Sequence, residues 1–243
     1  MKINRHIRDQ LTPDGILRVG LNMANKLLVS GTTSTGNPDG VAPDLARELA
    51  KRLSVDISLI KFSSPGELAD MTGKNYWDIG MIGDEPERAK IIDFSKSYVE
   101  IDATYMVTDE SPFLNAADID QKHVRIAVSS RSAYDLYLSR HLKNATLVRA
   151  KGVPAAVSIF KNDGLEALAG LRPALTAEAK NISGTRVVDG KFTSVQQAIG
   201  VEKGKSQAAK FINQFVEKAR SSGLIQQLID KHGVTGRLSV GTS

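Results

Sequence analysis

The sequence predicts an α/β protein with two lobes, each built from strands that alternate with helices. A strand–helix–strand rhythm runs from Gly15 to Ile82, and the same rhythm restarts at Val124. Two β-rich segments, 101–107 and 194–201, are suited to carry the chain from one lobe to the other and back. The length of 243 residues accommodates two compact domains of about 100–150 residues each.

The first half of the chain begins with a strand that ends at Asn22. After a loop rich in glycine, serine, threonine and proline comes a helix in which Leu45, Leu49 and Leu53 fall on one face. Asp44 suits the amino end of this helix, and two basic residues suit its carboxyl end. The predicted elements are strands over 15–22, 55–60 and 77–82 and helices over 43–53 and 66–72. This order is typical of a parallel sheet covered by helices.

The second half repeats this design. Tyr134, Leu138 and Leu142 share one helical face, and Pro173 suits the first turn of a further helix. The predicted elements are strands over 124–128, 145–149 and 165–169 and helices over 132–142, over 153–160 and from 173 onward. After the second β-rich segment the chain is helical again, and Gly223 separates the last two helices.

Two crossings imply a discontinuous first lobe into which the second lobe is inserted. We expect lobe 1 to comprise residues 1–105 and 199–243, and lobe 2 to comprise residues 106–198, with the hinge crossings near 101–107 and 194–201. A hinge of two strands permits opening and closing around a ligand.

The composition excludes several classes of function. The formal net charge is +5, but basic and acidic residues are interleaved and aromatic residues make up only 5%, so no nucleic-acid partner is expected. With no cysteine and four dispersed histidines, we expect no disulfide and no metal. The chain has no Gly-x-Ser-x-Gly elbow, no phosphate loop and no Gly-x-Gly-x-x-Gly after a strand, so no catalytic residue and no cofactor are predicted.

The amino-terminal ten residues lack the apolar stretch of a secretory leader. We therefore expect a periplasmic location if a leader has been removed, and a cytoplasmic one otherwise. No segment approaches the roughly eighteen consecutive apolar residues of a membrane span.

The segment around Arg88 is the most specific in the chain. A buried strand is expected to end at Gly83, and Pro86 is expected to open a helix with Arg88 in its first turn. A cation near a helix amino end is unfavourable unless an anion is bound there. Arg88 is therefore a candidate clamp for a carboxylate, which a planar guanidinium binds with two hydrogen bonds. The alternative is a salt bridge to Glu85 or Asp93.

An ordered set of motifs extends over nearly the whole chain. The set comprises Leu17-Arg-Val-Gly20, Gly40-Val-Ala-Pro-Asp-Leu-Ala46, Trp77-Asp78, Pro86-Glu-Arg88, Ile92-Asp-Phe-Ser95 with Tyr98, Val124-Arg-Ile-Ala-Val128, Gly200-Val-Glu-Lys-Gly204 and Gly223-Leu-Ile225. Together they resemble the family 3 extracellular solute-binding proteins, the amino-acid-type binding components of ABC importers. The resemblance implies two Rossmann-like lobes of the type II periplasmic-binding-protein architecture and a small-molecule ligand, an organic acid or amino-acid-like compound, held in the cleft between them. It also implies an ABC transporter permease as partner, and we expect a monomer.

The resemblance assigns Arg88 to the carboxylate of the ligand, with the backbone of Gly83 beside it. In lobe 2 it points to residues around Ser132 and Ala133, at the start of a helix whose free N–H groups suit an anion. Arg131 stands where the family usually has glycine. It is either a second cation for the ligand or a solvent-facing side chain.

Amino-acid binders of this family commonly present an acidic side chain that pairs with the α-ammonium group of the ligand. At that position this chain has Leu171, followed by Arg172, and both residues are candidates for contact with the ligand. An apolar residue cannot neutralise a buried ammonium group, and an uncompensated buried charge costs several kcal/mol. We therefore expect an organic anion, a carboxylate that need not be an α-amino acid. Asp84 or Glu85 could supply a substitute acid from lobe 1.

Two further polar side chains are candidates for the cleft. Asn22, at the end of the first strand, either hydrogen-bonds a ligand or caps its own loop. Of Gln196 and Gln197 on the return crossing, strand alternation lets only one face the cleft, and Gln197 is the candidate.

Two other functions remain open at this point. A cyclohexadienyl dehydratase-like enzyme on the same fold would need a general acid in the cleft, for which Glu85 is the candidate. A cytoplasmic sensor resembling the effector domains of LysR-type regulators would need a DNA-reading helix-turn-helix, and the residues before the first strand are too few to form one.

Overall fold

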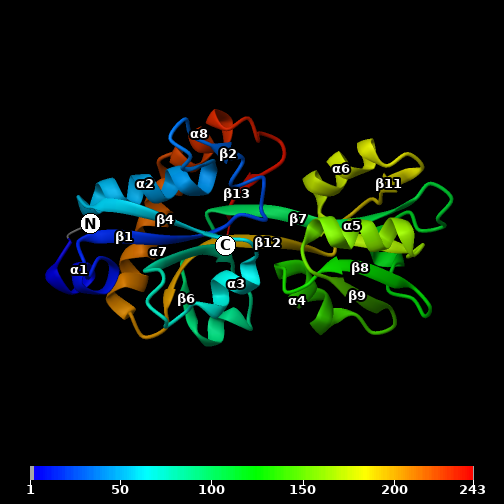
Figure 1. Cartoon of the computed structure of the whole chain (residues 1–243), viewed down its shortest axis with the longest axis horizontal. Helices are drawn as coiled ribbons and strands as arrows, with labels where there is room; N and C mark the ends of the chain where they lie inside the picture. The colour runs from blue at the N-terminus through cyan, green and yellow to red at the C-terminus, as the bar shows by residue number, and fades with distance from the viewer. Residues whose placement is uncertain (1–2, 243) are drawn as a thin grey trace. The chain divides into compact units, whose positions relative to one another are not determined.

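The computed structural model describes residues 3–242 and divides into two compact units (Figure 1). Unit 1 comprises Met1–Glu100 and Gln196–Ser243, and unit 2 comprises Ile101–Val195. The chain passes between them within two long strands, β7 (Val99–Thr108) and β12 (Thr193–Glu202). The boundaries therefore fall after residues 100 and 195, where the sequence prediction had placed them after residues 105 and 198.

A mixed sheet forms the centre of unit 1. Its strands are β1 (Ile16–Asn22), β4 (Asp56–Phe62), β5 (Ile79–Gly83), β6 (Ile92–Phe94) and β13 (Ser239–Val240). β1 pairs in parallel with β4 on one side and β5 on the other, and β12 returns antiparallel to β5. β6 adds to β12, and β13 adds to the unit 1 part of β7. A separate hairpin pairs β2 (Gly31–Thr32) with β3 (Pro38–Asp39).

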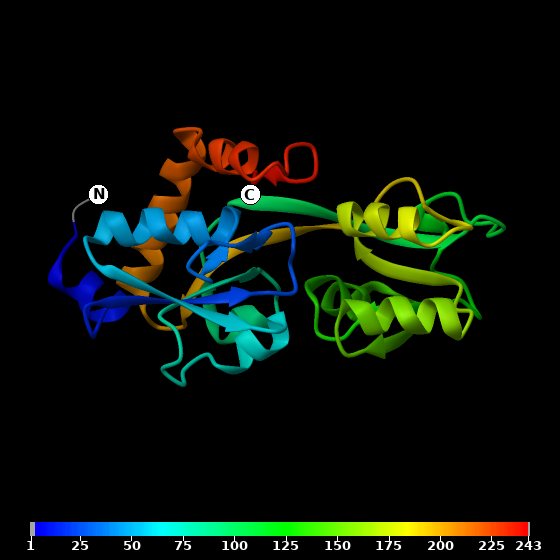
Figure 2. The same cartoon turned by 45° about the horizontal axis from the view of Figure 1, so that its top comes forward.

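Helices cover both faces of this sheet. They are α1 (Arg5–Leu11), α2 (Val41–Leu53), α3 (Pro65–Asp70), α7 (Ser206–Ser221) and α8 (Leu224–Lys231). α2 packs on β1 and β4 and also contacts α8, and α3 packs on the other side of the same strands (Figure 2). Leu45, Leu49 and Leu53 are fully buried, as their spacing predicted. None of the helices among residues 3–242 is both long and apolar enough to cross a membrane.

Trp77, the single tryptophan of the chain, is a core residue of unit 1. It is buried, and its indole Nε1 donates a hydrogen bond to the Leu68 carbonyl oxygen at 3.1 Å. The neighbouring strand residue Gly80 leaves room for this packing, because a Cβ atom there would lie 2.9 Å from the Leu68 side chain. Trp77 therefore contributes to the packing of unit 1.

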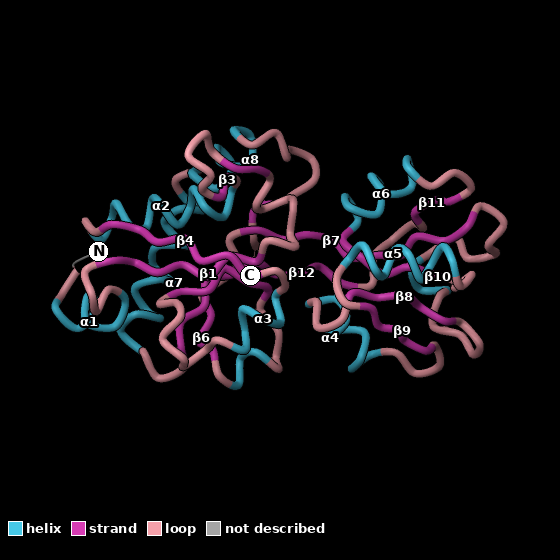
Figure 3. The backbone as a smooth tube through the Cα atoms, in the orientation of Figure 1, coloured by secondary structure: helices cyan, strands magenta, loops and turns pink. Residues whose placement is uncertain are grey.

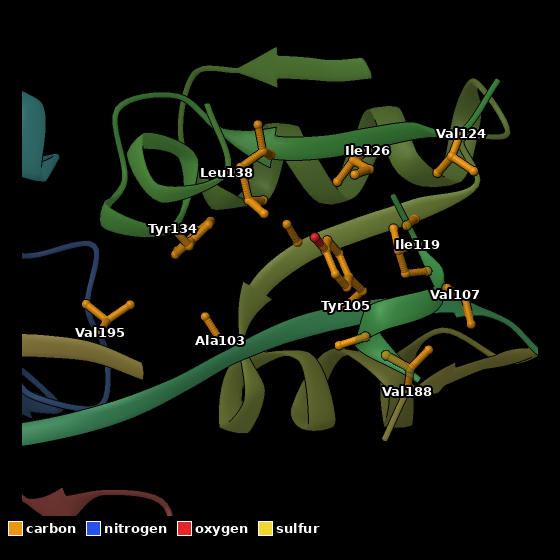
Figure 4. Packing of buried hydrophobic residues seen from close by; sticks show 14 of the residues in the cluster. Ala103, Tyr105, Val107, Ile119, Val124, Ile126, Tyr134, Leu138, Val188 and Val195 are labelled. Carbon is orange, nitrogen blue, oxygen red and sulfur yellow. The ribbon is translucent and has the colours of Figure 1, made fainter. Parts of the chain in front are cut away.

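The strands of unit 2 continue the same hydrogen-bonded sheet through β12 and β7, and their pairing is mixed. These strands are β8 (Arg125–Ser129), β9 (Thr146–Ala150), β10 (Ala167–Leu171) and β11 (Thr185–Val187), and the helices of unit 2 are α4 (Ala133–His141), α5 (Val153–Asn162) and α6 (Arg172–Asn181). β8 pairs in parallel with β9 and β10, while β7 runs antiparallel to β10 and β11 (Figure 3). The core on one side of this sheet surrounds the buried ring of Tyr105, with Ile126, Leu138 and Val188 pointing toward it (Figure 4).

Several short elements carry no clear sequence signal. The sequence did not predict α1, the β2–β3 hairpin, β6, β11 or β13. The strands among these elements have only two or three residues, which are too few to show an alternating pattern. The helix expected to begin at Pro86 was wrong in kind. The chain forms only a single 3-10 turn, η1 (Arg88–Lys90), before β6 begins.

Candidate ligand-binding site

The carboxyl-terminal edge of the unit 1 sheet brings several predicted residues together. Because β1, β4 and β5 are parallel, their last residues lie at one edge, and ligands of open α/β sheets bind at such edges. Asn22 ends β1 and Gly83 ends β5. β12 then pairs Gln197 with Gly83 in the antiparallel direction. Asn22, Gly83 and Gln197 therefore share this edge, although they are far apart in the sequence.

Arg88 folds back over the end of β5. The residue is only 5% exposed. Its Nη1 donates a hydrogen bond to the Gly83 carbonyl oxygen at 2.7 Å, and its backbone N–H donates to the Glu85 carbonyl oxygen at 2.9 Å. The guanidinium is thus held at the same edge as Gly83, with both residues buried. The dipole of a three-residue 3-10 turn is negligible, so the expected helix amino end that would favour an anion at Arg88 is not present.

Two acidic residues follow β5 directly. The Asp84 backbone N–H donates to the Gln196 carbonyl oxygen at 2.8 Å, which ties this loop to β12. The Asp84 side chain is exposed, yet the protein packed around it raises the pKa of its carboxyl group, and the positive charge of Arg88 partly opposes that rise. Glu85 is buried, with 6% exposure. The site edge thus carries one cation and two carboxyl groups.

Asn22 and Gln197, the two amide side chains at this edge, differ in their burial and hydrogen bonding. The Asn22 Oδ1 accepts a hydrogen bond from the Ala24 N–H at 3.2 Å, which is the loop-capping role that the sequence left open. The Gln197 side chain is buried, and the backbone carbonyl oxygen of Gln197 accepts the Tyr98 N–H at 2.8 Å. Its neighbour Gln196 is half-buried. Of the two glutamines, Gln197 is therefore the one enclosed at the edge.

In unit 2, the candidate residues lie in the turn between β8 and α4. Ser132 is the N-cap of α4, and its Oγ accepts the Asp135 N–H at 3.1 Å. Ala133 is the buried first residue of the helix. Arg131 is exposed and has a φ of 59°, in the left-handed region that glycine adopts most readily. The turn keeps a glycine-like backbone although an arginine occupies it.

Leu171 and Arg172 stand at the junction of β10 and α6. Leu171 ends β10, is half-buried and packs against the unit 2 core around Tyr105. The Nη2 of Arg172 donates hydrogen bonds to the carbonyl oxygens of Val188, at 3.1 Å, and of Gly190. These contacts favour a structural role for Arg172, which anchors the loop before β12, over the ligand contact that the sequence suggested.

One model of a protein family matches residues 17–235, and its description is bacterial extracellular solute-binding proteins, family 3. The chain belongs to this family. A probable histidine-binding protein of Neisseria gonorrhoeae is 26% identical over 227 residues, which cover 90% of this chain and 84% of that protein. The resemblance stated from sequence motifs is thereby confirmed.

Solved structures place this solute-binding protein in the type II periplasmic-binding-protein architecture. The ancestral amino acid-binding protein AncCDT-1, a precursor of cyclohexadienyl dehydratase, superposes with a TM-score of 0.75 at 22% identity, covering 92% of this chain and 97% of that one. The amino acid ABC transporter substrate-binding protein AbpA of Streptococcus pneumoniae, bound to L-arginine, gives a TM-score of 0.75 at 20% identity, with 92% and 97% coverage. At these identities the likeness establishes the fold.

Two residues of this solute-binding protein escaped the sequence prediction of the site. Asp135 is only 2% exposed, and its Oδ1 accepts a hydrogen bond from Arg149 Nε at 2.9 Å. Its Oδ2 accepts the backbone N–H of Arg131 at 2.7 Å. The signal that could have found Asp135 is the Ser-x-x-Asp spacing from Ser132, a helix-capping pattern. Arg149 is brought to it by β9 and has no local signal.

One group of side chains among residues 3–242 has metal-like spacing, formed by Asp39, Asp44 and His232. The Asp44 carboxylate already accepts hydrogen bonds from Lys231 Nζ at 2.6 Å, Arg47 Nη1 at 2.7 Å and His232 Nε2 at 2.8 Å. Burial alone would raise the pKa of Asp44, but the hydrogen bonds from Lys231, His232 and Arg47 lower it to about 2. The group is a salt-bridge network that joins α2 to the end of α8.

Proposed function

We propose that this family 3 solute-binding protein captures a small organic anion through its carboxylate, for uptake by an ABC-type importer or for sensing. The observation that carries the proposal is Arg88, a buried guanidinium held at the carboxyl edge of a parallel sheet beside Gly83. The gonococcal relative is named for histidine and AbpA is bound to L-arginine. Both of these ligands carry a carboxylate that an arginine can bind.

The ligand class is narrowed further by the position that would meet an α-ammonium group. Leu171 is apolar there and packs into the unit 2 core, so it offers no counter-charge. Asp84, the substitute acid that the sequence offered from lobe 1, is an exposed side chain. The apolar side chain at position 171 supports a carboxylate ligand without an α-ammonium group.

A panel of matched acids tests both levels of this proposal. Each pair has the same carbon skeleton with and without the amine: L-alanine and lactate, L-histidine and imidazolelactate, L-glutamate and 2-oxoglutarate. Thermal unfolding is followed with each compound, since a ligand at a hundredfold excess over its dissociation constant adds about 2.7 kcal/mol of stability. Calorimetric titration then gives the affinities.

We expect the amine-free member of at least one pair to bind more tightly than its amino acid. Tighter binding of the amino acids would contradict the amine-free ligand class and leave carboxylate capture in place. If no organic acid bound at millimolar concentration, carboxylate capture itself would be wrong.

A second candidate function is a dehydratase reaction on the same fold. It is favoured by the pairing of Asp84, whose pKa is raised, with the buried Glu85 at the edge that holds Arg88. A protonated carboxyl group there would protonate the leaving hydroxyl group of prephenate, so that water and carbon dioxide depart together. Incubation with prephenate and with arogenate, followed by detection of the aromatic product, decides this candidate. Absence of turnover above the uncatalysed rate would remove it.

A further inference from the structure

The turn between β8 and α4 holds a non-glycine residue in a conformation that L-amino acids rarely adopt. Arg131 has a φ of 59°, and its Cβ makes this left-handed conformation unfavourable for an isolated arginine. Such a conformation persists only where surrounding contacts fix it. The contact that bears on it directly is the hydrogen bond from the Arg131 N–H to Asp135 Oδ2, at 2.7 Å.

Asp135 makes two hydrogen bonds within the turn, one through its side chain and one through its backbone. Its carboxylate accepts the Arg131 N–H, and its own N–H donates to Ser132 Oγ at 3.1 Å. The Ser132 N–H in turn donates to the carbonyl oxygen of Ser129, the last residue of β8, at 3.3 Å. The backbone between the strand and the helix is therefore fixed at successive points within one turn.

The Asp135 carboxylate is itself held in place from a neighbouring strand. Arg149 Nε, on β9, donates to Asp135 Oδ1 at 2.9 Å, and Arg149 Nη2 donates to Ser139 Oγ at 2.7 Å. One carboxylate oxygen thus accepts from Arg149 and, at 3.4 Å, from Ser139 Oγ, and the other accepts the Arg131 N–H. This division compensates a charge that is 2% exposed and gives it a fixed direction.

We propose that Asp135 is a positioning residue, which holds Arg131 in the left-handed conformation and thereby sets the turn of residues 129–132. A contact between this turn and the ligand rests on the proposed function. The role of Asp135 in setting the turn rests only on its hydrogen bonds with Arg131, Ser132 and Arg149. In a chain with glycine at position 131 the backbone would need no such support, so the role of Asp135 depends on the presence of Arg131.

The test compares wild type with Asp135→Asn, Arg131→Gly, the double variant and Ser139→Ala. Asparagine replaces one carboxylate oxygen by an NH2 group, so a donor would face either Arg149 or the Arg131 N–H, each of which now donates to its own oxygen. Glycine adopts a positive φ without penalty. Ser139→Ala is the matched control, because it removes the Ser139 Oγ contacts with Arg149 and with the Oδ1 and backbone carbonyl oxygen of Asp135, but leaves the hydrogen bond from the Arg131 N–H to Asp135 Oδ2. Amide hydrogen exchange by NMR and urea unfolding are measured on ligand-free protein.

We expect Asp135→Asn to speed exchange of the residue 131 amide at least tenfold and to lower the urea midpoint. In the Arg131→Gly background the drop in midpoint caused by Asp135→Asn should be less than half as large. Ser139→Ala should leave the residue 131 amide within twofold of wild type. Equal drops in both backgrounds, or an unchanged residue 131 amide, would show that Asp135 is only a helix cap.

Two further arms keep the proposal testable. If Asp135→Asn does not fold, the wild-type protein is titrated with acid while the Asp135 carboxyl carbon and the Arg131 amide are followed together by NMR. Separate transitions of the two signals would overturn the proposal.

For any acid of the panel that binds, Asp135→Asn should weaken affinity at least threefold with Arg131 present and less than twofold in the Arg131→Gly background. Failure of this arm alone counts against the turn as a ligand contact, and failure of the whole panel counts against the proposed function.

Discussion

In the proposed function, ligand capture depends most directly on Arg88. We predict that Arg88→Ala weakens binding of the panel acids more than tenfold, about 1.4 kcal/mol or more, because a carboxylate loses a charged donor in a buried setting. Arg88→Lys should recover only part of the affinity, since an ammonium group lacks the planar fork. Calorimetric titration measures both variants.

The control for this prediction is Arg125→Ala. Arg125 pairs with Glu166 in unit 2 and lies on the surface, so its removal should leave affinity unchanged. Affinity that is the same for Arg88→Ala and wild type would remove the carboxylate clamp.

In the proposed function, Leu171 sets the preference for a ligand with or without an amine. Leu171→Asp would supply the carboxylate that amino-acid binders present at this position, whereas Leu171→Asn has the same shape without the charge. We predict that Leu171→Asp shifts the affinity ratio of L-histidine to imidazolelactate at least tenfold toward the amino acid. Leu171→Asn should shift it less than threefold. Equal shifts in the two variants would mean that charge at position 171 does not govern selectivity.

For single residues, the sequence predicted which ones lie near one another better than it predicted their hydrogen-bond partners. It located Arg88 beside Gly83 and left open whether Asn22 caps its loop, which the structure answers with the Ala24 contact. It offered Arg172 as a ligand residue, but the guanidinium binds backbone carbonyl oxygens in the loop before β12. A side chain's hydrogen-bond partners depend on loops far away in the sequence, and no local pattern reports them.

Among the elements, α2 and α8 are joined by the Asp44 network, whose charge state makes the junction sensitive to acid. The pKa of Asp44 falls from 3.8 to about 2 on folding. A carboxyl group with a lowered pKa contributes stability above its unfolded value, and that contribution is lost as the pH falls through the folded value.

We therefore predict that Asp44→Asn lowers the free energy of unfolding at pH 7 by on the order of 1–2 kcal/mol, allowing for solvent screening. The difference from wild type should shrink between about pH 4 and pH 2, where wild-type Asp44 takes up a proton. Urea unfolding at these pH values measures it, with Glu48→Gln, in the exposed pair with Lys51, as control. A difference that did not depend on pH would refute the charge network as its cause.

The long elements were predictable and the short ones were not. The strand and helix periodicities placed β1, α2 and α7 because each buries a repeated set of apolar residues. The turn after Pro86 was predicted as a helix from proline placement alone. A first-turn proline is compatible with a helix but does not require one, and the chain enters β6 at Ile92 before a full helical turn is complete.

For the whole molecule, the crossing strands explain why the unit boundaries were harder to predict than the units. β7 and β12 are continuous, with residues of both units in one strand, so neither composition nor a turn marks the point of passage. Just inside unit 2 the two strands are tied together, since Ser194 Oγ and Lys191 Nζ both donate to Asp102 Oδ1, at 2.7 and 2.8 Å.

The placement of β12 also has a consequence for how the protein is made. β12 lies beside β5 in the sheet of unit 1, yet a ribosome reaches it only after the whole of unit 2 has been synthesised. At about 5–20 residues per second, β5 waits several seconds with one edge uncovered, while unit 2 is contiguous and has all its strands available earlier. We expect nascent chains to acquire a folded second unit first and to complete the first unit only near the end of translation.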